Sequence, residues 1–497
     1  MNLSMLLDIV AAGCGDRVLL GDVESGLTGA ELDRRATLGA HVLLDAGVDT
    51  VAYLADNGPD FAVTLFAAAR AGIPFLPMNF RLASEQIDEI VSRRARPLVI
   101  GNGHRPSHGS FMSIEDWSAA TAVAAEPPTR ALPFAAFDEP AVLLMTSGTT
   151  AAPKTAVLRH ENLTSYIINT VEFASAPPDS SILVSVPPYH IAAVANVLSN
   201  LYAGRRLVYL TKFDAGAWID IARAQAVTNA MVVPTMLARI VDELTTRGEN
   251  GPDTLRTLSY GGAKVSPTVL ANALELFPET GFVNGYGLTE TASSIAVLGP
   301  DDHRTAQRSD VPEVRARLAS VGKPLPEVTI EVHDPDGRPC PPGVEGDIVV
   351  RGGQIAGAYA EKGSLVDADG WFHTRDLGHF DADGYLFVHG RADDTIIRGG
   401  ENIAPAEIED VLVGHPEVHE CAVAGVPDDE WGHRIAAFVV LTPGATTGAS
   451  DLRQWVRDRL RGSKTPSDVV FVEELPTTAT GKLLRRELVK LVATPAS

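Results

Sequence analysis

The sequence has few cysteines, no long apolar run and no excess of basic residues. Its three cysteines, Cys14, Cys340 and Cys421, are spaced too widely for a metal-ligand motif and are odd in number. We therefore expect a reducing compartment rather than a disulfide framework. No apolar run approaches the ~18 residues that cross a bilayer. These absences exclude an integral membrane protein and favour a cytoplasmic one.

The chain also lacks the positive charge that a nucleic-acid or anionic-membrane partner requires. Its formal net charge is -22, so no broad basic face is expected. A small anionic ligand is still allowed, because a few local cations and backbone N–H groups can hold it. The opening MNLSMLLDIVAAGCGD lacks a basic region and carries Asp8, which predicts a first helix rather than a signal peptide.

The order of apolar and polar segments predicts an α/β protein of more than one domain. TVAYLAD, PDFAVTLFAAARAG and IPFLPM alternate between strand and helix patterns, as in parallel sheets covered by helices. After about residue 320, short strands joined by Gly/Pro/Asp turns follow. The last hundred or so residues predict helix-strand-strand-helix-strand-helix, enough for a small α+β domain. A boundary is expected near Arg391 to Asp394.

One stretch with phosphate-binding chemistry is MTSGTTAAPKTAV, residues 145–157. Its hydroxyls and free N–H groups can surround an anion, and Lys154 adds a positive charge. A P-loop would place glycine where Pro153 stands, and a helix would follow directly. Here TAVL reads as a strand, and a helical pattern resumes only near His160. We therefore expect a strand-loop-strand hairpin; a plain surface turn is the alternative.

A second stretch, VNGYGLTET, combines an aromatic ring, a hydroxyl and a carboxylate. Tyr286 lies between two glycines, which let a flat ring approach it closely. Thr289 supplies a hydroxyl, and Glu290 is a hard oxygen ligand suited to Mg²⁺. The structural alternative is a strand-to-helix turn with Thr289 as the N-cap.

Three further candidates lie elsewhere in the chain. In WFHTRDLGHFDADGYLFVHGRADD, Asp376 can accept hydrogen bonds from ribose hydroxyls and Arg391 can hold an oxygen, although DADG also predicts a plain hairpin turn. In LPTTATGKLLRREL, Lys482 precedes a basic helix start, which indicates an anionic target; an exposed lysine is the alternative. His190 in VPPYHIAA is a lone histidine, which is more often structural.

Taken together and in this order, these motifs resemble the adenylate-forming superfamily of acyl-CoA and aryl-CoA synthetases and peptide-synthetase adenylation domains. GRADDTIIRGGENIAPAEIE is most similar to bacterial acyl-CoA or aryl-CoA ligases, including fatty-acid–CoA ligases. The resemblance covers essentially the whole chain. It implies a large N-terminal domain, 1–392, with αβαβα-type subdomains and a small β-barrel-like part. A small mobile α+β C-terminal domain, 393–497, follows.

The resemblance also implies a reaction. A carboxylate attacks the α-phosphate of Mg·ATP, which gives acyl-AMP and pyrophosphate, and a thiol then displaces AMP. The thiol is coenzyme A in the main interpretation, so the implied cofactors are ATP, Mg²⁺ and coenzyme A. A small carboxylic acid is the implied partner, with no nucleic acid. A homodimer and a carrier-protein partner both stay open.

Site residues are carried over by matching motifs. The ATP site is Thr146, Ser147, Gly148, Thr149, Thr150, Lys154, Gly262, Ala263, Asn284, Gly285, Tyr286, Thr289, Asp376, Arg391 and Lys482. The catalytic set is Lys482, His190, Thr289 and the Mg²⁺ ligand Glu290. The acyl site is Tyr189, His190, Met231, Tyr260 and Gly261. The CoA site is Gly399, Gly400 and Lys464, and the hinge is Asp393, about which rotation withdraws Lys482 for the second half-reaction.

The chain departs from the family pattern at four places. Ala151 and Thr155 replace two glycines of the usual TSGTTGxPKG, at a cost of ~1 kcal/mol or more if positive φ is needed. Arg375 replaces the glycine of the usual TGD. GSKTPSD retains only Lys464 from a usually basic cluster, so transfer to a carrier-protein phosphopantetheine or release of acyl-AMP stays open.

Two other functions compete with the ligase. A P-loop kinase or ATPase would yield ADP, and a non-catalytic nucleotide- or acyl-binding homologue would yield no product. Pro153 and the strand-like TAVL argue against the first, and the presence of Lys482, Glu290, Asp376 and Arg391 argues against the second.

Overall fold

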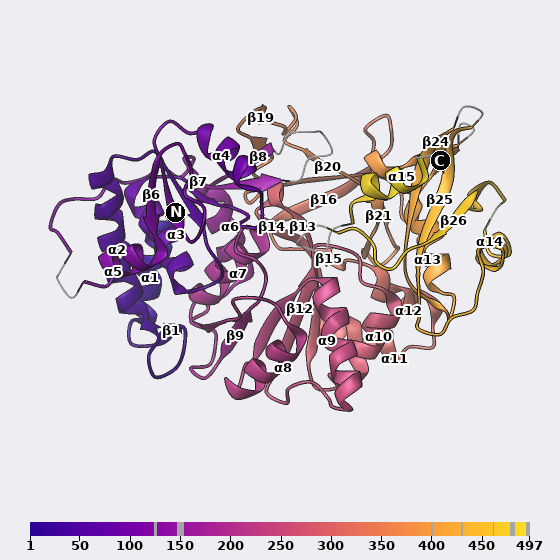
Figure 1. Cartoon of the computed structure of the whole chain (residues 1–497), viewed down its shortest axis with the longest axis horizontal. Coiled ribbons are helices and arrows are strands. Elements are labelled where there is room, and N and C mark those ends of the chain that lie inside the picture. Colours follow the sequence, from indigo (N-terminus) through magenta and orange to yellow (C-terminus); the bar gives the residue numbers. More distant parts are fainter. Residues whose placement is uncertain are drawn as a thin grey trace.

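The computed structural model describes residues 1–123, 127–146, 154–398, 401–428, 431–460, 462–477 and 483–493. Two large sheets come first, a small antiparallel sheet follows, and the tail forms a fourth sheet with its own helices (Figure 1). No described helix is both long and apolar enough to cross a membrane.

The first large sheet has eight strands in the order β19-β18-β8-β7-β4-β3-β5-β6. β7, β4, β3, β5 and β6 pair in parallel, whereas β8 pairs antiparallel with β7, and β18 and β19 continue the sheet antiparallel beyond β8. The strands are β3 (Thr50–Leu54), β4 (Phe75–Pro77), β5 (Pro97–Gly101), β6 (Ser110–Ser113), β7 (Pro140–Thr146), β8 (Lys154–Arg159), β18 (Ala358–Tyr359) and β19 (Gly363–Ser364). The helices of this part are α1 (Leu3–Cys14), α2 (Gly29–Ala46), α3 (Pro59–Ala71), α4 (Ser84–Ser92), α5 (Ile114–Thr121) and α6 (His160–Thr170).

The second large sheet has nine strands in the order β15-β14-β13-β12-β11-β9-β10-β1-β2, parallel from β13 to β1. The strands are β1 (Val18–Leu20), β2 (Leu27–Thr28), β9 (Ser181–Val184), β10 (Arg206–Tyr209), β11 (Asn229–Val232), β12 (Thr257–Gly261), β13 (Gly281–Leu288), β14 (Ser293–Leu298) and β15 (Lys323–Pro324). The helices are α7 (Ile191–Tyr202), α8 (Ala215–Ala224), α9 (Pro234–Arg247), α10 (Pro267–Leu276), α11 (Pro300–Arg308) and α12 (Pro312–Ala316), with 3-10 turns η1 (Thr289–Thr291) and η2 (Arg317–Ala319).

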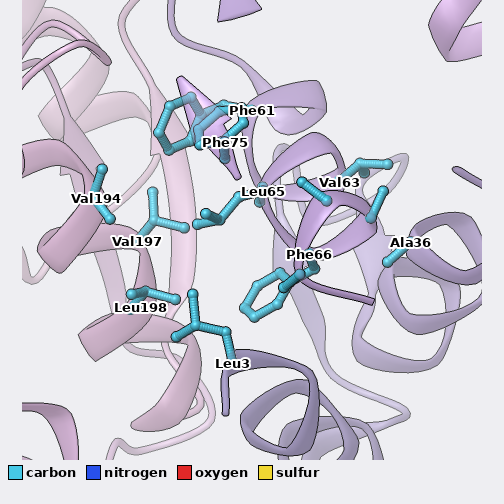
Figure 2. Packing of buried hydrophobic residues seen from close by; sticks show 14 of the residues in the cluster. Leu3, Ala36, Phe61, Val63, Leu65, Phe66, Phe75, Val194, Val197 and Leu198 are labelled. Atoms are coloured by element: carbon cyan, nitrogen blue, oxygen red, sulfur yellow. The ribbon is translucent and has the colours of Figure 1, made fainter. Parts of the chain in front are cut away.

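One core joins the two sheets. Phe66 and Leu65 of α3 point toward Val197 and Leu198 of α7, and Leu3 of α1 joins them (Figure 2). Side chains of both sheets enter the same cluster. Helices α8–α10 cover the far face of the second large sheet, and α4 covers the far face of the first. The layers therefore run αβαβα, as expected. This shared core holds the edges of both sheets in a fixed relation to one another.

The remaining strands form two antiparallel-rich units. The small sheet contains β16 (Val328–His333), β17 (Gly346–Gly352), β20 (Phe372–Phe380) and β21 (Leu386–Arg391). The tail contains η3 (Ala392–Asp394), β22 (Ile396–Arg398), β23 (Glu401–Ile403), α13 (Pro405–Val413), β24 (Val418–Asp428), β25 (Gly432–Leu441), α14 (Ala449–Arg457), η4 (Gly462–Lys464), β26 (Asp468–Phe471) and α15 (Arg485–Ala493).

The predicted element order of the tail is confirmed from α13 to α15, and a β22–β23 hairpin precedes it. The predicted β-barrel-like part corresponds to the small four-stranded sheet, and at its outer edge Leu386 of β21 exchanges two backbone hydrogen bonds of 2.8 Å with Val321 and Gly322, just before β15. Two hydrophobic clusters consist only of residues after position 395, and the other clusters end before 389. This separation agrees with a boundary between 392 and 393, which stays a prediction.

Candidate active site

The predicted hairpin after residue 140 is present. β7 and β8 pair antiparallel, and Thr146 lies opposite Lys154 in the register. α6 begins only at His160, so the residue after the lysine continues a strand and does not start a helix. This geometry differs from that of a P-loop. Ser147, Gly148, Thr149 and Thr150 lie outside the described residues.

The YGLTET stretch forms a sharp strand-to-strand turn. β13 ends at Leu288, η1 follows, and β14 begins at Ser293. Ala292 and Ser293 have positive φ (53° and 130°), which costs energy for residues other than glycine. Gly287 is required, because a Cβ there would lie 2.0 Å from the Ser293 carbonyl oxygen. The hydroxyl bonded to the Leu288 N–H belongs to Thr291, so Thr289 is not the N-cap.

Asp376 and Arg391 lie opposite each other on β20 and β21. Arg391 Nη1 lies 3.3 Å from Asp376 Oδ1 and donates to the Thr374 carbonyl at 2.8 Å. Asp376 is only 7% exposed. The backbone of this segment is therefore the plain hairpin that the DADG turn predicts. The hairpin also buries the Asp376 carboxylate in an ion pair with Arg391.

Two tyrosine hydroxyls connect these segments. Tyr286 donates to Asp376 Oδ2 at 2.6 Å, which joins the second large sheet to the small one. Tyr359 of β18 donates to the carboxylate of Glu290, which joins the first large sheet to η1. The Tyr359 ring also lies 5.7 Å from Lys154 Nζ. Residues from positions 146 to 391 therefore meet in one place.

Burial and the facing carboxylates set the protonation of this network. Burial first, then the charge of Asp376, raises the pKa of Tyr286 well above its usual value. Burial and then Glu290 likewise raise the pKa of Tyr359. Burial opposes the charge of Arg391, but Asp376 and Glu290 outweigh it and raise the pKa of Arg391. Both hydroxyls therefore stay protonated donors, and both carboxylates face a donor.

Glu290 fits the magnesium ligand that the sequence predicts. It is 8% exposed and faces the cluster just described. Within the described residues no group of three His, Cys, Asp or Glu side chains could hold a metal alone. Mg²⁺ suits this arrangement, because it commonly takes one or two protein carboxylates together with substrate phosphates.

Of the predicted adenine-lining residues, Gly262 and Ala263 directly follow β12, and Asn284 to Tyr286 lie within β13. Asn284 pairs with Tyr260 in the register, and its side chain donates to the Ser320 carbonyl at 3.2 Å. Gly261 lets the strands approach, since a Cβ there would lie 2.3 Å from the Gly285 carbonyl oxygen. Gly262 and Ala263 are exposed in the following loop.

The predicted acyl residues divide between two faces of the second sheet. Met231 lies opposite Ser259 and Val184, so these three side chains share a face. Val184 packs in the core that contains α7, the helix that His190 precedes. Tyr189 and His190 have ring centroids 4.7 Å apart, and the Phe80 ring lies 5.7 Å from Tyr189. Burial lowers the pKa of His190 to about 4, so this imidazole is neutral near pH 7.

Tyr260 requires a correction. Side chains alternate along β12, which places Tyr260 on the face opposite to Ser259. Its hydroxyl lies 2.9 Å from His303 Nε2, and its ring packs edge-on against Phe282. The Tyr260 ring is therefore a core group behind the strand, and only its backbone borders the predicted acyl face.

Among the predicted tail residues, two are described and three are not. Lys464 binds the carboxylate of Glu407 at 2.5–2.7 Å, and Asp393 Oδ2 lies 3.5 Å from Arg375 Nη1. Gly399, Gly400 and Lys482 lie outside the described residues. Arg375 has a φ of 62°, the conformation that the usual glycine adopts freely.

Sequence reasoning missed the residues that hold the cluster together. Tyr359 and Glu361 belong to a short segment next to β8, and Gln354 donates to the carbonyls of Thr291 and Ser294 at 3.0 and 2.8 Å. GAYAEKG offers no motif, and its partners lie about 70 to 200 residues away. A short aromatic strand after a glycine turn is the only sequence signal for it.

A fold of two helix-sandwiched sheets with a small tail unit, and phosphate-, ribose- and metal-compatible groups at their junction, defines a nucleotide-dependent enzyme. The family model "AMP-binding enzyme" matches residues 7–360, and "AMP-binding enzyme C-terminal domain" matches 407–482. The chain belongs to the AMP-binding enzyme family.

Named relatives agree with this membership. Feruloyl-CoA synthase of Amycolatopsis sp is 37% identical, with 93% of this chain and 94% of that protein covered. Fatty acid–[acyl-carrier-protein] ligase ScoC of Streptomyces coeruleorubidus is 32% identical, with 93% and 91% covered. The ATP-bound crystal structure of MatB from Rhodopseudomonas palustris superposes with a TM-score of 0.85 at 27% identity, covering 99% of both chains. The predicted class, an AMP-forming acid–thiol ligase, is confirmed.

Proposed function

We propose that the cluster around Tyr286, Glu290 and Asp376 is the site where ATP activates a carboxylic acid. The observation that carries the proposal is the pair of tyrosine–carboxylate bonds, which bring ribose-, phosphate- and metal-binding groups from three sheets together. Asp376 and Arg391 hold the ribose, and Tyr286 presents its face to adenine. Thr146 and Lys154 hold the outer phosphates, and Thr289 holds the α-phosphate.

In the first half-reaction, a carboxylate oxygen attacks the α-phosphorus and the bond to the β-phosphate breaks, releasing pyrophosphate. Glu290 would hold Mg²⁺, which when bound neutralises charge on the phosphates. His190 lies beside the acyl carboxylate as a neutral imidazole, so it donates a hydrogen bond without contributing a second charge. Lys482 is assigned to the charge that develops between carboxylate and α-phosphate.

In the second half-reaction, the thiol sulfur attacks the acyl carbon, the thiol proton leaves and AMP departs with the carboxylate oxygen. We assign the tail, 393–497, to the exchange between half-reactions, with Asp393 as the hinge and Gly399–Gly400 as the segment that meets the thiol. The separate tail cores support this assignment, because they let the tail move as one body.

The acid is proposed to be apolar and aromatic. The rings of Phe80, Tyr189 and His190 lie next to one another, and Met231 shares the adjoining face. Feruloyl-CoA synthases, whose name states an aromatic acyl group, are among the relatives with 37% identity. Aromatic side chains bind flat rings through edge and face contacts.

Coenzyme A is the proposed acceptor, and a carrier-protein phosphopantetheine is the second candidate. The second candidate is favoured by the Lys464–Glu407 ion pair, which neutralises the one cation assigned to CoA phosphates. ScoC, a relative by 32% identity, is named for an acyl-carrier-protein acceptor. Acyl transfer from a preformed adenylate to CoA and to a phosphopantetheinylated carrier, followed by mass spectrometry, distinguishes the two acceptors.

The function is tested by ATP–pyrophosphate exchange with a panel of aromatic and aliphatic acids. We expect exchange that depends on the acid and is strongest with an aromatic one. ATP binding without exchange for any acid would support a non-catalytic homologue, and formation of ADP would contradict the proposed chemistry.

A further inference from the structure

Thr155 is the residue after Lys154, at a position where glycine is usual in similar enzymes. It is completely buried on β8, opposite Met145. It is absent from the described residues with positive φ, so the strain expected of a replaced glycine does not arise. A threonine here adds a hydroxyl that glycine lacks, and a buried hydroxyl needs a partner.

Glu361 supplies that partner. Its Oε1 accepts from Thr155 Oγ1 at 2.8 Å, and its Oε2 accepts from the Thr155 N–H at 3.0 Å. The neighbouring Ala360 N–H donates to the Thr155 carbonyl at 2.9 Å. All three polar groups of Thr155 are thus bound by two consecutive residues. Hydrogen bonds to a carboxylate are about twice as strong as neutral ones.

The chain just before Glu361 is bonded to the turn that carries Glu290. We call residues 356–361 the bridging segment. The N–H groups of Ala356 and Gly357 each donate to the Glu290 carbonyl at 2.9 Å, and Tyr359 donates to the Glu290 carboxylate. One six-residue segment therefore connects Glu290 with the strand that begins at Lys154.

We propose that Glu361 is a positioning residue for ATP, acting through Thr155 on Lys154. The proposal rests on the proposed function, in which Lys154 binds the outer phosphates. Glu361 fixes both the N–H and the hydroxyl of Thr155, so the start of β8 keeps one position relative to Glu290. Arg93 Nη1 lies 3.9 Å from Glu361 and helps to hold the carboxylate in place. Thr155 and Glu361 act as one unit: glycine would leave the backbone at this position flexible, whereas the threonine hydroxyl bonds to Glu361.

The test compares ATP with AMP, because only ATP has the outer phosphates. Calorimetric Kd values are measured for both nucleotides with the full chain and with Glu361→Ala, Glu361→Gln, Thr155→Val and Thr155→Ser. We expect Glu361→Ala and Thr155→Val to weaken ATP binding about tenfold, the loss typical of a hydrogen bond to a charged group, and to leave AMP binding within twofold. Thr155→Ser retains the hydroxyl and should behave as the parent, and Glu361→Gln should be intermediate.

A double variant and a matched control complete the test. Thr155→Val with Glu361→Ala should be no weaker for ATP than either single variant, because the two act as one unit. Glu331→Ala removes a carboxylate that pairs with His333 on β16 and is not one of the residues assigned to the site, so it should change neither Kd. Equal weakening of ATP and AMP would show a merely structural role and overturn the proposal, as would unchanged ATP binding in Glu361→Ala. Because binding is measured, a parent protein that fails to exchange pyrophosphate would refute the proposed function without deciding this test.

Discussion

The cluster around Tyr286, Glu290 and Asp376 and the tail, residues 393–497, are held by interactions of different kinds. In the cluster, Asp376 and Glu290 are 7% and 8% exposed and each accepts a tyrosine hydroxyl. Toward the tail, the ion pair Lys264–Asp410 has side chains 46% and 53% exposed, and the pair Arg375–Asp393 has side chains 60% and 45% exposed. Buried, satisfied networks are rigid, whereas exposed ion pairs contribute about 0–1 kcal/mol each.

This difference matches the two tasks assigned to the regions. A site that must place a carboxylate against the α-phosphorus gains from groups fixed before ATP arrives. A tail that serves two half-reactions must be able to change position, so its contacts with the rest of the chain must break at a small cost in free energy. Exposed pairs between the tail and the rest of the chain meet that need, while the tail's own buried clusters keep it folded.

The largest effect is expected from Asp376→Ala. It leaves the Tyr286 hydroxyl and the Arg391 guanidinium without their carboxylate, which we expect to cost about 3 kcal/mol of unfolding free energy and to abolish ATP binding. Asp376→Asn retains an acceptor and should lose less stability. Urea unfolding and calorimetry measure both; full stability in Asp376→Ala would show that the cluster is not preorganised by this residue.

Lowering the pH should destabilise the N-terminal part of the chain, because this part contains two buried histidines. Burial lowers the pKa of His160 to about 4, as it does for His190. Each of these histidines binds a proton near pH 6.5 in the unfolded chain, but only near pH 4 in the folded chain. The free energy of unfolding is therefore highest above pH 6.5 and decreases as the pH falls toward 4. Each group contributes up to about 3 kcal/mol. Denaturant unfolding between pH 7 and 4.5 measures the slope, which His160→Asn should reduce; an unchanged slope would contradict the assignment.

Arg375→Gly should stabilise the protein by about 0.5–1 kcal/mol. The gain comes from relieving a φ of 62° in a residue with a side chain, and the lost exposed pair to Asp393 offsets little of it. Arg375→Ala removes the same pair but retains the strained conformation, so it is the matched control and should give no gain. Equal melting temperatures for the two variants would exclude backbone strain as the cause.

The smallest effect is expected at the exposed contact between Lys264 and Asp410. A double-mutant cycle with alanine at both positions should give a coupling of less than about 1 kcal/mol that decreases with added salt. A coupling of several kcal/mol would mean that the tail is locked in the observed arrangement, which would contradict its assigned movement.

Much of the architecture was predictable because local patterns and tertiary packing agree. Pro153 and the strand-like TAVL correctly predicted a hairpin rather than a P-loop, and the apolar runs after Pro405 gave the correct order of tail elements. Tyr260 was misjudged because composition does not set which face of a strand each residue takes. The Thr155–Glu361 contact spans 206 residues and carries no motif, so only the folded chain reveals it.

The proposed function requires one site to split ATP between its first and second phosphorus atoms after attack by a carboxylate. The most direct measurement supplies an acid labelled with ¹⁸O in its carboxylate, together with ATP and a thiol acceptor, and follows the label by mass spectrometry. We expect AMP that carries one ¹⁸O atom and unlabelled pyrophosphate. ADP as the nucleotide product, or AMP without the label, would contradict it.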